Sequence, residues 1–298
     1  MSLLYNIHML FGIYTNANKD NDCVFTRRLT SFLQSEKLDF AVHSSLSKYF
    51  PEAAVFARIT SDFDVALVIG GDGTVLRVAA DCARAGVPIL GFNCGYVGFL
   101  TEGETDGFEN AVRQVASHKF SVESRSMLVC RAANKTGYAL NDIVVSRTKG
   151  KLISLDVYSE GKFIDSHYCD GFIISTPTGS TAYSLSAGGP IISPGASVTA
   201  LTPINSHTLH SRPIVTGDDE KISVRLSEHT GNAAVYADGN IITKLDGGDS
   251  VFVEKALHKA LFVRLENYNF YEKLFIKLNK WGVVNDKEHY DDENKQTE

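Results

Sequence analysis

The chain has 298 residues, of which 44% are hydrophobic and 21% are charged, enough to bury a sizeable core. Its 29 Lys and Arg residues against 35 Asp and Glu residues give a formal net charge of −6, which excludes nucleic-acid binding driven by overall positive charge. No apolar run approaches the roughly 20 residues of a membrane-spanning helix, and residues 1–8 lack a secretory pattern. We therefore expect a cytoplasmic protein that contacts neither nucleic acid nor membrane.

The five cysteines are odd in number, and no two of them form a C-x-x-C pair. This pattern favours free thiols in a reducing compartment over a disulfide framework or a zinc knuckle. His207 and His210 lie three residues apart, but no further ligand set accompanies them. We therefore assign no residue as a metal ligand.

The first hundred residues alternate between strand and helix patterns. Helical spacing of apolar residues predicts helices over 25–33 and 75–83, and Gly86 is placed to end the second one. Short apolar segments predict strands over residues 9–14, 38–42, 65–69 and 88–91. Residues 65–69 are apolar throughout, as in the strands of a sheet that is buried on both faces. This alternation predicts an α/β domain with an open, mostly parallel sheet.

After a further helix over 108–115, residues 120–265 change to short β-rich segments separated by glycine turns. This pattern predicts a mostly antiparallel, all-β, sandwich-like domain. Apolar residues from Phe270 to Leu278 predict a last helix that ends near Trp281-Gly282. We expect three regions: an α/β domain from 1–100 plus about 268–284, a β-rich domain over 101–267, and a disordered acidic tail over 285–298.

The segment Gly70-Gly71-Asp72-Gly73-Thr74 follows an apolar strand and opens a helix. Glycines let the backbone approach a bulky ligand, and the N-terminus of a helix offers free N–H groups and a positive dipole end to an anion such as phosphate. A carboxylate at this position repels phosphate unless it has another task. Two tasks fit Asp72: accepting a proton from a hydroxyl, or helping to hold a magnesium ion.

This glycine loop is neither a Walker A loop nor a G-x-G-x-x-G fingerprint, because Leu76 occupies the third glycine position. Without a P-loop lysine, the charge of a phosphate must be neutralised by a metal ion and by more distant bases such as Arg77. A second loop, 93–100, follows the next strand. Since the ends of neighbouring parallel strands line one crevice, we expect the two loops to face one another.

Two further segments are candidates for binding a polar ligand. Asn141-Asp142 comes just before a strand, where it serves either as a turn or as a holder of ribose hydroxyls. The run from Asp170 to Pro190 is rich in hydroxyl side chains and is held by apolar residues at both ends. Tyr183 in this run offers a ring for stacking on a base. Asp238-Gly239-Asn240, in contrast, is first of all typical of a hairpin turn.

Together, these segments resemble the NAD kinase family over about residues 9–281. The glycine–aspartate loop alone is also similar to that of diacylglycerol and sphingosine kinases, whereas the run 175–183 is specific to NAD kinase. The resemblance implies a phosphotransferase that uses Mg²⁺ and transfers the γ-phosphoryl group of ATP to the 2′-hydroxyl of the adenosine ribose of NAD, giving NADP and ADP. It also implies a homodimer or homotetramer.

The same resemblance assigns roles to individual residues. It makes Asp72 the base that accepts the 2′-hydroxyl proton, and it brings the backbone of Gly71 and Gly73 close to the phosphates. Asn141 and Asp142 would hold ribose. The family's usual pair is Asn-Glu, so the carboxylate of Asp142 is one methylene shorter here.

The resemblance also implies that further residues bind the dinucleotide. Asp170 and Ala182 would read the nicotinamide amide, and Tyr183 and Ser186 the adenine side. We include in the expected substrate-binding set the secondary positions Lys151, Thr178, Thr181, Ser184, Leu185 and Asn240.

Two alternatives stay open at this point. One is a kinase of the same superfamily that acts on a lipid or sphingoid base, which needs an apolar acceptor channel. The other is a non-catalytic module that senses NAD or NADP and forms no NADP from ATP and NAD. The hydroxyl-rich run argues against the first, and Asp72 among its glycines argues against the second.

Overall fold

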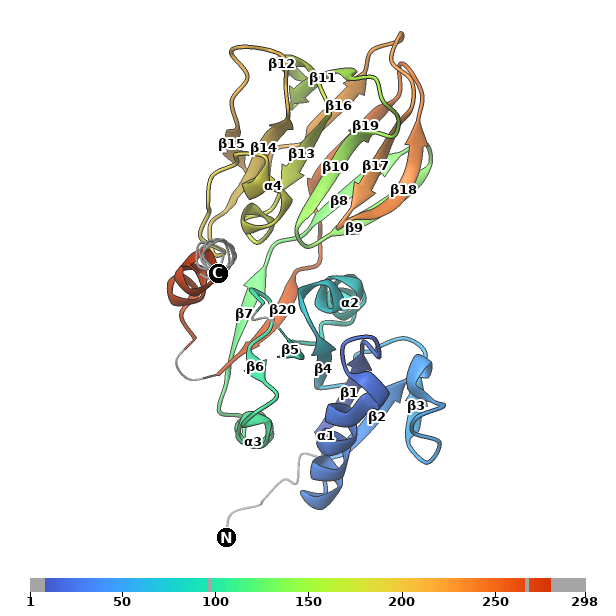
Figure 1. Ribbon diagram of the computed structural model, residues 1–298, viewed down its shortest axis with the longest axis vertical. Coiled ribbons are helices and arrows are strands. Elements are labelled where there is room, and N and C mark those ends of the chain that lie inside the picture. Colours follow the sequence, from blue (N-terminus) through green and yellow to red (C-terminus); the bar gives the residue numbers. More distant parts are fainter. Residues whose placement is uncertain (1–8, 96–97, 266–267, 280–298) are drawn as a thin grey trace, which may run out of the picture.

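The computed structural model describes residues 9–95, 98–265 and 268–279. An α/β part and a β-sandwich part lie one above the other, and helix α2 (Asp72–Ala85) lies in the first part at their junction (Figure 1). Within the described ranges, no helix has the length and apolar composition needed to cross a membrane.

The first sheet has eight strands in the order β3-β2-β1-β4-β5-β20-β7, with β6 beside β5. Neighbouring strands are parallel, except that β20 and β7 are antiparallel. The predicted open, mostly parallel sheet is therefore confirmed. Its strands are β1 (Leu10–Thr15), β2 (Asp39–His43), β3 (Ala54–Phe56), β4 (Val65–Gly70), β5 (Ile89–Asn93), β6 (Gly103–Glu104), β7 (Ser121–Arg125) and β20 (Ala260–Arg264).

Helices cover both faces of this sheet. Helices α1 (Val24–Ser35) and α3 (Phe108–Ala116) pack in one apolar cluster, and α2 packs in another. Leu67 of β4 belongs to the first cluster and the next residue, Val68, to the second, which explains why β4 is apolar at every position. Short 3₁₀ turns lie near the ends of β1 and β2: η1 (Asn21–Cys23) and η2 (Ser44–Leu46).

The strand order places a crevice beside β1. From β1 the chain crosses through α1 to β2, whereas from β4 it crosses through α2 to β5 on the other side. The two connections diverge between β1 and β4, and such a switch point at the carboxyl ends of parallel strands is where open α/β sheets bind ligands.

The second part is a sandwich of two six-stranded antiparallel sheets, in the orders β15-β14-β13-β10-β17-β18 and β12-β11-β16-β19-β8-β9. A single apolar cluster, to which both sheets contribute, fills the space between them. The predicted sandwich-like domain is confirmed. One sheet comprises β10 (Asp142–Arg147), β13 (Gly171–Ser175), β14 (Val198–Ile204), β15 (Ile214–Gly217), β17 (Ala233–Ala237) and β18 (Asn240–Leu245). The other comprises β8 (Leu128–Ala132), β9 (Lys135–Ala139), β11 (Ile153–Ser159), β12 (Lys162–Cys169), β16 (Ile222–Leu226) and β19 (Ser250–Lys255).

The limits of the two parts differ from the expected division at residues 100 and 267. Helix α3 and strands β6, β7 and β20 lie with the first sheet rather than with the sandwich. The chain leaves the first sheet after β7 and returns to it at β20, which pairs with both β5 and β7. Those pairings place the two ends of the sandwich segment on neighbouring strands of the α/β sheet.

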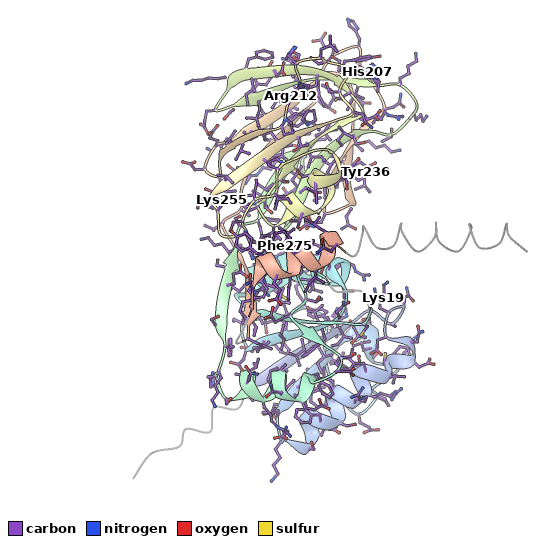
Figure 2. All side chains as sticks on the ribbon, turned by 60° about the vertical axis from the view of Figure 1, so that its left-hand side comes forward. Lys19, His207, Arg212, Tyr236, Lys255 and Phe275 are labelled. Carbon is purple, nitrogen blue, oxygen red and sulfur yellow. The ribbon has the colours of Figure 1, made fainter. Side chains whose placement is uncertain are left out.

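Residues 270–279 are helical and cross the junction of the two parts (Figure 2). This confirms the start of the predicted last helix. Its predicted end near Trp281-Gly282 and the expected acidic tail 285–298 lie outside the described residues.

Close packing fixes the hydroxyl-rich segment, which contains η3 (Gly179–Thr181) and α4 (Tyr183–Ser186), against the residue before β10. A Cβ atom on Gly179 would lie 2.1 Å from the carbonyl oxygen of Asn141. Backbone cannot yield as a flexible side chain does. Only glycine therefore fits this contact.

We expect Gly179→Ala to lower the free energy of unfolding by about 1–3 kcal/mol, because the added methyl group overpacks a backbone contact. Urea unfolding monitored by circular dichroism measures the change. Gly195→Ala is the matched control, since a Cβ atom there meets nothing within 4 Å. Equal unfolding midpoints for the two variants would contradict this account.

Candidate active site

The glycine loop lies at the carboxyl edge of the first sheet. Strand β4 ends at Gly70 and helix α2 begins at Asp72, with Gly71 at its N-cap. The hydroxyl of Thr74 accepts hydrogen bonds from Gly71 N (3.5 Å) and from Asn16 Nδ2 (3.4 Å), which ties the loop to the end of β1. Thr74 N and Val75 N donate to Gly71 O, so the helix begins at the loop and directs its positive N-terminal end at this edge, which favours an anion.

The carboxylate of Asp72 holds the loop that follows β5. Its Oδ2 accepts a hydrogen bond from Phe99 N (2.8 Å) and its Oδ1 one from Leu100 N (3.0 Å). A Cβ atom on Gly98 would lie 2.0 Å from Asp72 Oδ1, so glycine is required for this approach. The expectation that loops 70–74 and 93–100 face one another is confirmed, although residues 96 and 97 lie outside the described ranges.

Three cavities follow one another around the first turns of α2. The first, the β1–β2 pocket, has about 420 Å³ and shares Asn16, Thr74 and Arg77 with the second. The second, the glycine-loop pocket, has about 390 Å³ and shares Leu76 and the 238–239 turn with the third. The third, the sandwich pocket, has about 430 Å³. The shared residues make the three cavities neighbours in a single row.

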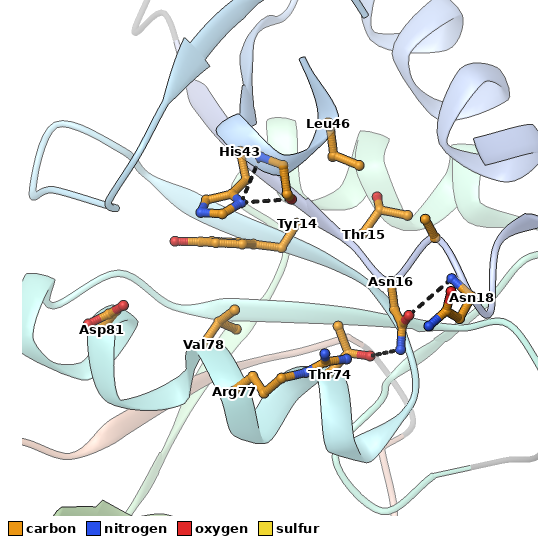
Figure 3. A pocket seen from close by; sticks show the side chains of 12 residues that line it. Tyr14, Thr15, Asn16, Asn18, His43, Leu46, Thr74, Arg77, Val78 and Asp81 are labelled. Atoms are coloured by element: carbon orange, nitrogen blue, oxygen red, sulfur yellow. Dashed lines mark hydrogen bonds between the residues drawn. The ribbon is translucent and has the colours of Figure 1, made fainter. Parts of the chain in front are cut away.

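The β1–β2 pocket lies at the switch point and has an aromatic wall (Figure 3). The rings of Tyr14 and His43 are stacked, with centroids 5.0 Å apart and an interplanar angle of 29°. His43 Nδ1 also lies 2.9 Å from the hydroxyl oxygen of Ser45. Burial raises the pKa of Tyr14 above its ordinary value, so the phenol stays neutral.

The glycine-loop pocket joins the two parts of the molecule. It is lined by Gly71, Gly73 and Arg77 from the first part and by the 238–240 turn of the sandwich. Arg77 therefore lies beside the loop, as expected from its position in α2. Asn240 also lies here, on the predicted hairpin turn, which joins β17 to β18 and is confirmed.

The sandwich pocket brings together several of the predicted dinucleotide-binding residues. Asn141 and Asp142 line it from the start of β10, and Ala182 and Tyr183 line it from the hydroxyl-rich segment. Tyr183 is 46% exposed, so this residue is accessible to a ligand.

The buried carboxylate of Asp142 lies beside that of Asp238. Burial first, and the charge of Asp238 second, raise the pKa of Asp142 to about 7. Asp238 accepts hydrogen bonds from the backbone N–H groups of Leu140 (2.7 Å), Asn141 (2.8 Å) and Asp142 (3.1 Å). Sequence reasoning missed this role of Asp238, because an Asp-Gly dipeptide indicates only a turn.

Several hydroxyls of the 175–186 segment stabilise the segment itself. Thr176 donates to Leu140 O (2.6 Å), Ser180 donates to Pro177 O (2.7 Å), and Ser184 lies 3.0 Å from the hydroxyl of Thr202. Thr178 and Thr181 are also buried, Leu185 is half-buried, and Ser186 is exposed. These contacts leave fewer hydroxyls facing a ligand than the composition of the segment indicates.

Asp170 and Lys151 lie away from the row of pockets. In the pairing of β10 with β13, Asp142 lies opposite Ser175 at one end and Ser146 lies opposite Gly171 at the other. About 14 Å of strand therefore separates Asp142 from Ser146. Asp170 is at the far end, where Asn205 and Arg147 donate hydrogen bonds that lower its pKa. Lys151 is exposed in the loop that follows β10. Within one chain, neither residue reaches Asp72.

Models of two family domains match most of the chain: the ATP-NAD kinase N-terminal domain over residues 11–120 and the ATP-NAD kinase C-terminal domain over 140–265. An NAD kinase of Caldicellulosiruptor saccharolyticus is 35% identical over 272 residues, which cover 91% of this chain and 100% of that protein. An NAD kinase of Teredinibacter turnerae is 36% identical over 263 residues, covering 85% and 90%.

Two solved structures share the fold. The yeast NADH kinase complexed with NADH superposes with a TM-score of 0.81 at 23% identity, covering 91% of this chain and 87% of that one. An NAD kinase from Archaeoglobus fulgidus in complex with ATP superposes with a TM-score of 0.74 at 29% identity, covering 91% and 99%. With both family domains matched in order and relatives aligned over nearly their whole length, the chain belongs to the NAD kinase family.

Proposed function

We propose that this chain is an ATP-dependent NAD kinase that phosphorylates the 2′-hydroxyl of the adenosine ribose, giving NADP and ADP. The observation that carries this proposal is the row of three pockets around the start of α2. The row gives separate places to a donor nucleoside, to its phosphates and to an acceptor. Membership of the family supports the same activity.

The glycine-loop pocket is the proposed place of the transferred phosphate. Its backbone N–H groups at the start of α2 and the guanidinium of Arg77 supply positive charge. Phosphoryl transfer depends on positioning and charge stabilisation more than on covalent help. The donor nucleoside then extends into the β1–β2 pocket, where the stacked rings of Tyr14 and His43 form a wall for the base.

The sandwich pocket is the proposed place of the acceptor. Asn141 and Asp142 offer an amide and a carboxyl group to ribose hydroxyls, and the exposed Tyr183 offers stacking to adenine. A lipid acceptor needs an apolar channel instead, and the two acids Asp142 and Asp238 in this wall oppose that alternative. Formation of NADP from NAD and ATP separates the kinase from a module that only senses NAD.

Asp72 is the proposed general base. Its side chain is 28% exposed, and it lies between Gly71 and Gly73. Each carboxylate oxygen accepts one backbone hydrogen bond, and Oδ1 keeps a further lone pair for the proton of a substrate hydroxyl. Asp72 can therefore accept the proton of the ribose hydroxyl as the oxygen attacks the γ-phosphorus.

Mg²⁺ is proposed as an ion that arrives with the triphosphate. The part of the chain that the structure describes has no group of three or more His, Cys, Asp or Glu residues that could hold a metal ion. Mg²⁺ commonly keeps several waters and binds one or two carboxylates together with substrate phosphates, so the single carboxylate of Asp72 fits such an ion. When bound, the ion neutralises charge on the phosphates.

The homodimer or homotetramer and the cytoplasmic location are further proposals. Asp170 and Lys151 lie away from Asp72 in one chain, so in an oligomer we assign them to the site of a neighbouring subunit. The cysteines Cys23, Cys82, Cys94, Cys130 and Cys169 are free, which suits a reducing compartment.

Asp72→Asn tests the general base. We expect the variant to bind NAD as the wild type does and to lose roughly 10²–10⁴-fold in turnover, because the amide accepts no proton. Calorimetric titration of NAD and an enzymatic cycling assay for NADP give the two quantities. Unchanged turnover would remove Asp72 from the mechanism.

His43→Ala tests the donor pocket. Loss of the stacking face should raise the KM for ATP roughly 10-fold and leave the KM for NAD unchanged, since base stacking contributes about 1–3 kcal/mol. Steady-state kinetics with each substrate varied in turn measures the effect. The control is His229→Ala, which removes an exposed imidazole between β16 and β17. Equal effects on both KM values would contradict the assignment.

Asp142→Asn tests the buried acid. The ordinary pKa of 3.8 applies to the unfolded chain and about 7 to the folded one, so the folded state keeps a proton that the unfolded state loses. The stability that this proton provides is fully present at low pH and is lost as the pH rises toward 7. Urea unfolding gives the free energy of unfolding at pH 5 and at pH 8. We expect this free energy to fall more between pH 5 and pH 8 for the wild type than for the variant. Parallel losses would show that Asp142 titrates normally.

A further inference from the structure

The helix over residues 270–279 places the side chain of Lys277 next to Asp72, the proposed general base. Lys277 Nζ lies 3.4 Å from Asp72 Oδ2, and it lies 4.0 Å from the centroid of the Phe99 ring. Phe99 in turn packs near Phe270 at the start of the helix, with ring centroids 6.4 Å apart. The ammonium thus joins the N–H groups of Phe99 and Leu100 as a third donor to the same carboxylate.

The helix is fixed in this position from one side. Lys273 Nζ donates to Thr101 O (2.9 Å) and to Glu102 Oε2 (3.3 Å), and Leu274 is buried. Lys273 and Lys277 are four residues apart and therefore lie on the same face of the helix. Tyr271 and Phe275 are 57% and 61% exposed, so the opposite side faces outward.

A buried ionic network anchors Lys273. Glu102 also pairs with Arg264 (3.1 Å), whose Nε pairs with Glu123 (2.5 Å). Glu123 pairs with Arg125, and Arg125 Nη1 donates to the hydroxyl of Thr178 (3.2 Å). Arg125 and Arg264 are only 2% and 4% exposed. The network links the last helix to the segment that carries Tyr183, so the position of Lys277 is set by both parts of the molecule.

A cation beside Asp72 has a use in the proposed reaction. The glycine loop contains no lysine, and the carboxylate of Asp72 beside a triphosphate repels its charge. We propose that Lys277 is a positioning residue for phosphoryl transfer, which holds the carboxylate of Asp72 against loop 98–100 and offsets its charge when phosphates enter. This inference rests on the proposed kinase function and on Asp72 as its base.

Lys277→Gln tests the proposal. Loss of the contact between the ammonium and the carboxylate should lower kcat roughly 10- to 100-fold and change the KM values for NAD and ATP by less than about 3-fold. Lys277→Arg, which keeps a cation, should recover most of kcat. Glu272→Gln removes an exposed charge from the same helix and should behave as the wild type. Thermal midpoints of all variants show whether they fold.

A double-variant cycle separates this role from a structural one. In the Asp72→Asn background, Lys277→Gln should lower kcat no further, because the group it positions is gone. An equal loss in both backgrounds, or an unchanged kcat for Lys277→Gln, would overturn the proposal. If Lys277→Gln does not fold, Lys277→Arg provides the test. A folded Lys277→Arg variant whose kcat is no higher than that of Asp72→Asn would also overturn the proposal. Wild-type chain that forms no NADP from NAD and ATP would instead refute the proposed function.

Discussion

The site depends on one carboxylate that closes the gap between two loops. Asp72 accepts hydrogen bonds from the N–H groups of Phe99 and Leu100, and these bonds join the loop after β4 to the loop after β5. The contact is possible only because Gly98 has no side chain to fill the space that Asp72 occupies. The same residue that is the proposed base therefore also orders the backbone around it, so its orientation is set before substrate arrives.

The strands that connect the two parts determine where the sandwich lies relative to this contact. Strands β7 and β20 lead from the first sheet into the sandwich and back, so the sandwich is held at the carboxyl edge where the glycine loop lies. The 238–240 turn then reaches the start of α2 and completes the glycine-loop pocket. Neither part of the chain forms this pocket alone, so the proposed donor and acceptor sites meet at the junction.

Buried charge is arranged differently in the two halves of the site. Near α2, Asp72 is balanced by N–H groups and by Lys277, whereas in the sandwich pocket Asp142 and Asp238 lie together without a buried base in the lining of that pocket. Asp238 is stabilised by three backbone N–H groups, and Asp142 keeps a proton up to about pH 7 because it is buried beside a second acid. Asp142 can thus act as a hydrogen-bond donor below that pH and as an acceptor above it.

The sequence by itself determined the elements and the main loops, because apolar periodicity and glycine positions report local backbone geometry. It predicted the parallel sheet, the sandwich, the glycine loop at its edge and the facing of loop 93–100, since strand ends in such sheets share one crevice. It did not predict the grouping of β7 and β20 with the first sheet, the support of Asp142 by Asp238, or the contact of Lys277 with Asp72. These depend on pairings between residues that are 96 to 205 positions apart, as for Asp142 with Asp238 and Lys277 with Asp72. Only the tertiary structure decided them, because a turn aspartate or a helix lysine carries no local signal of the distant group that it meets.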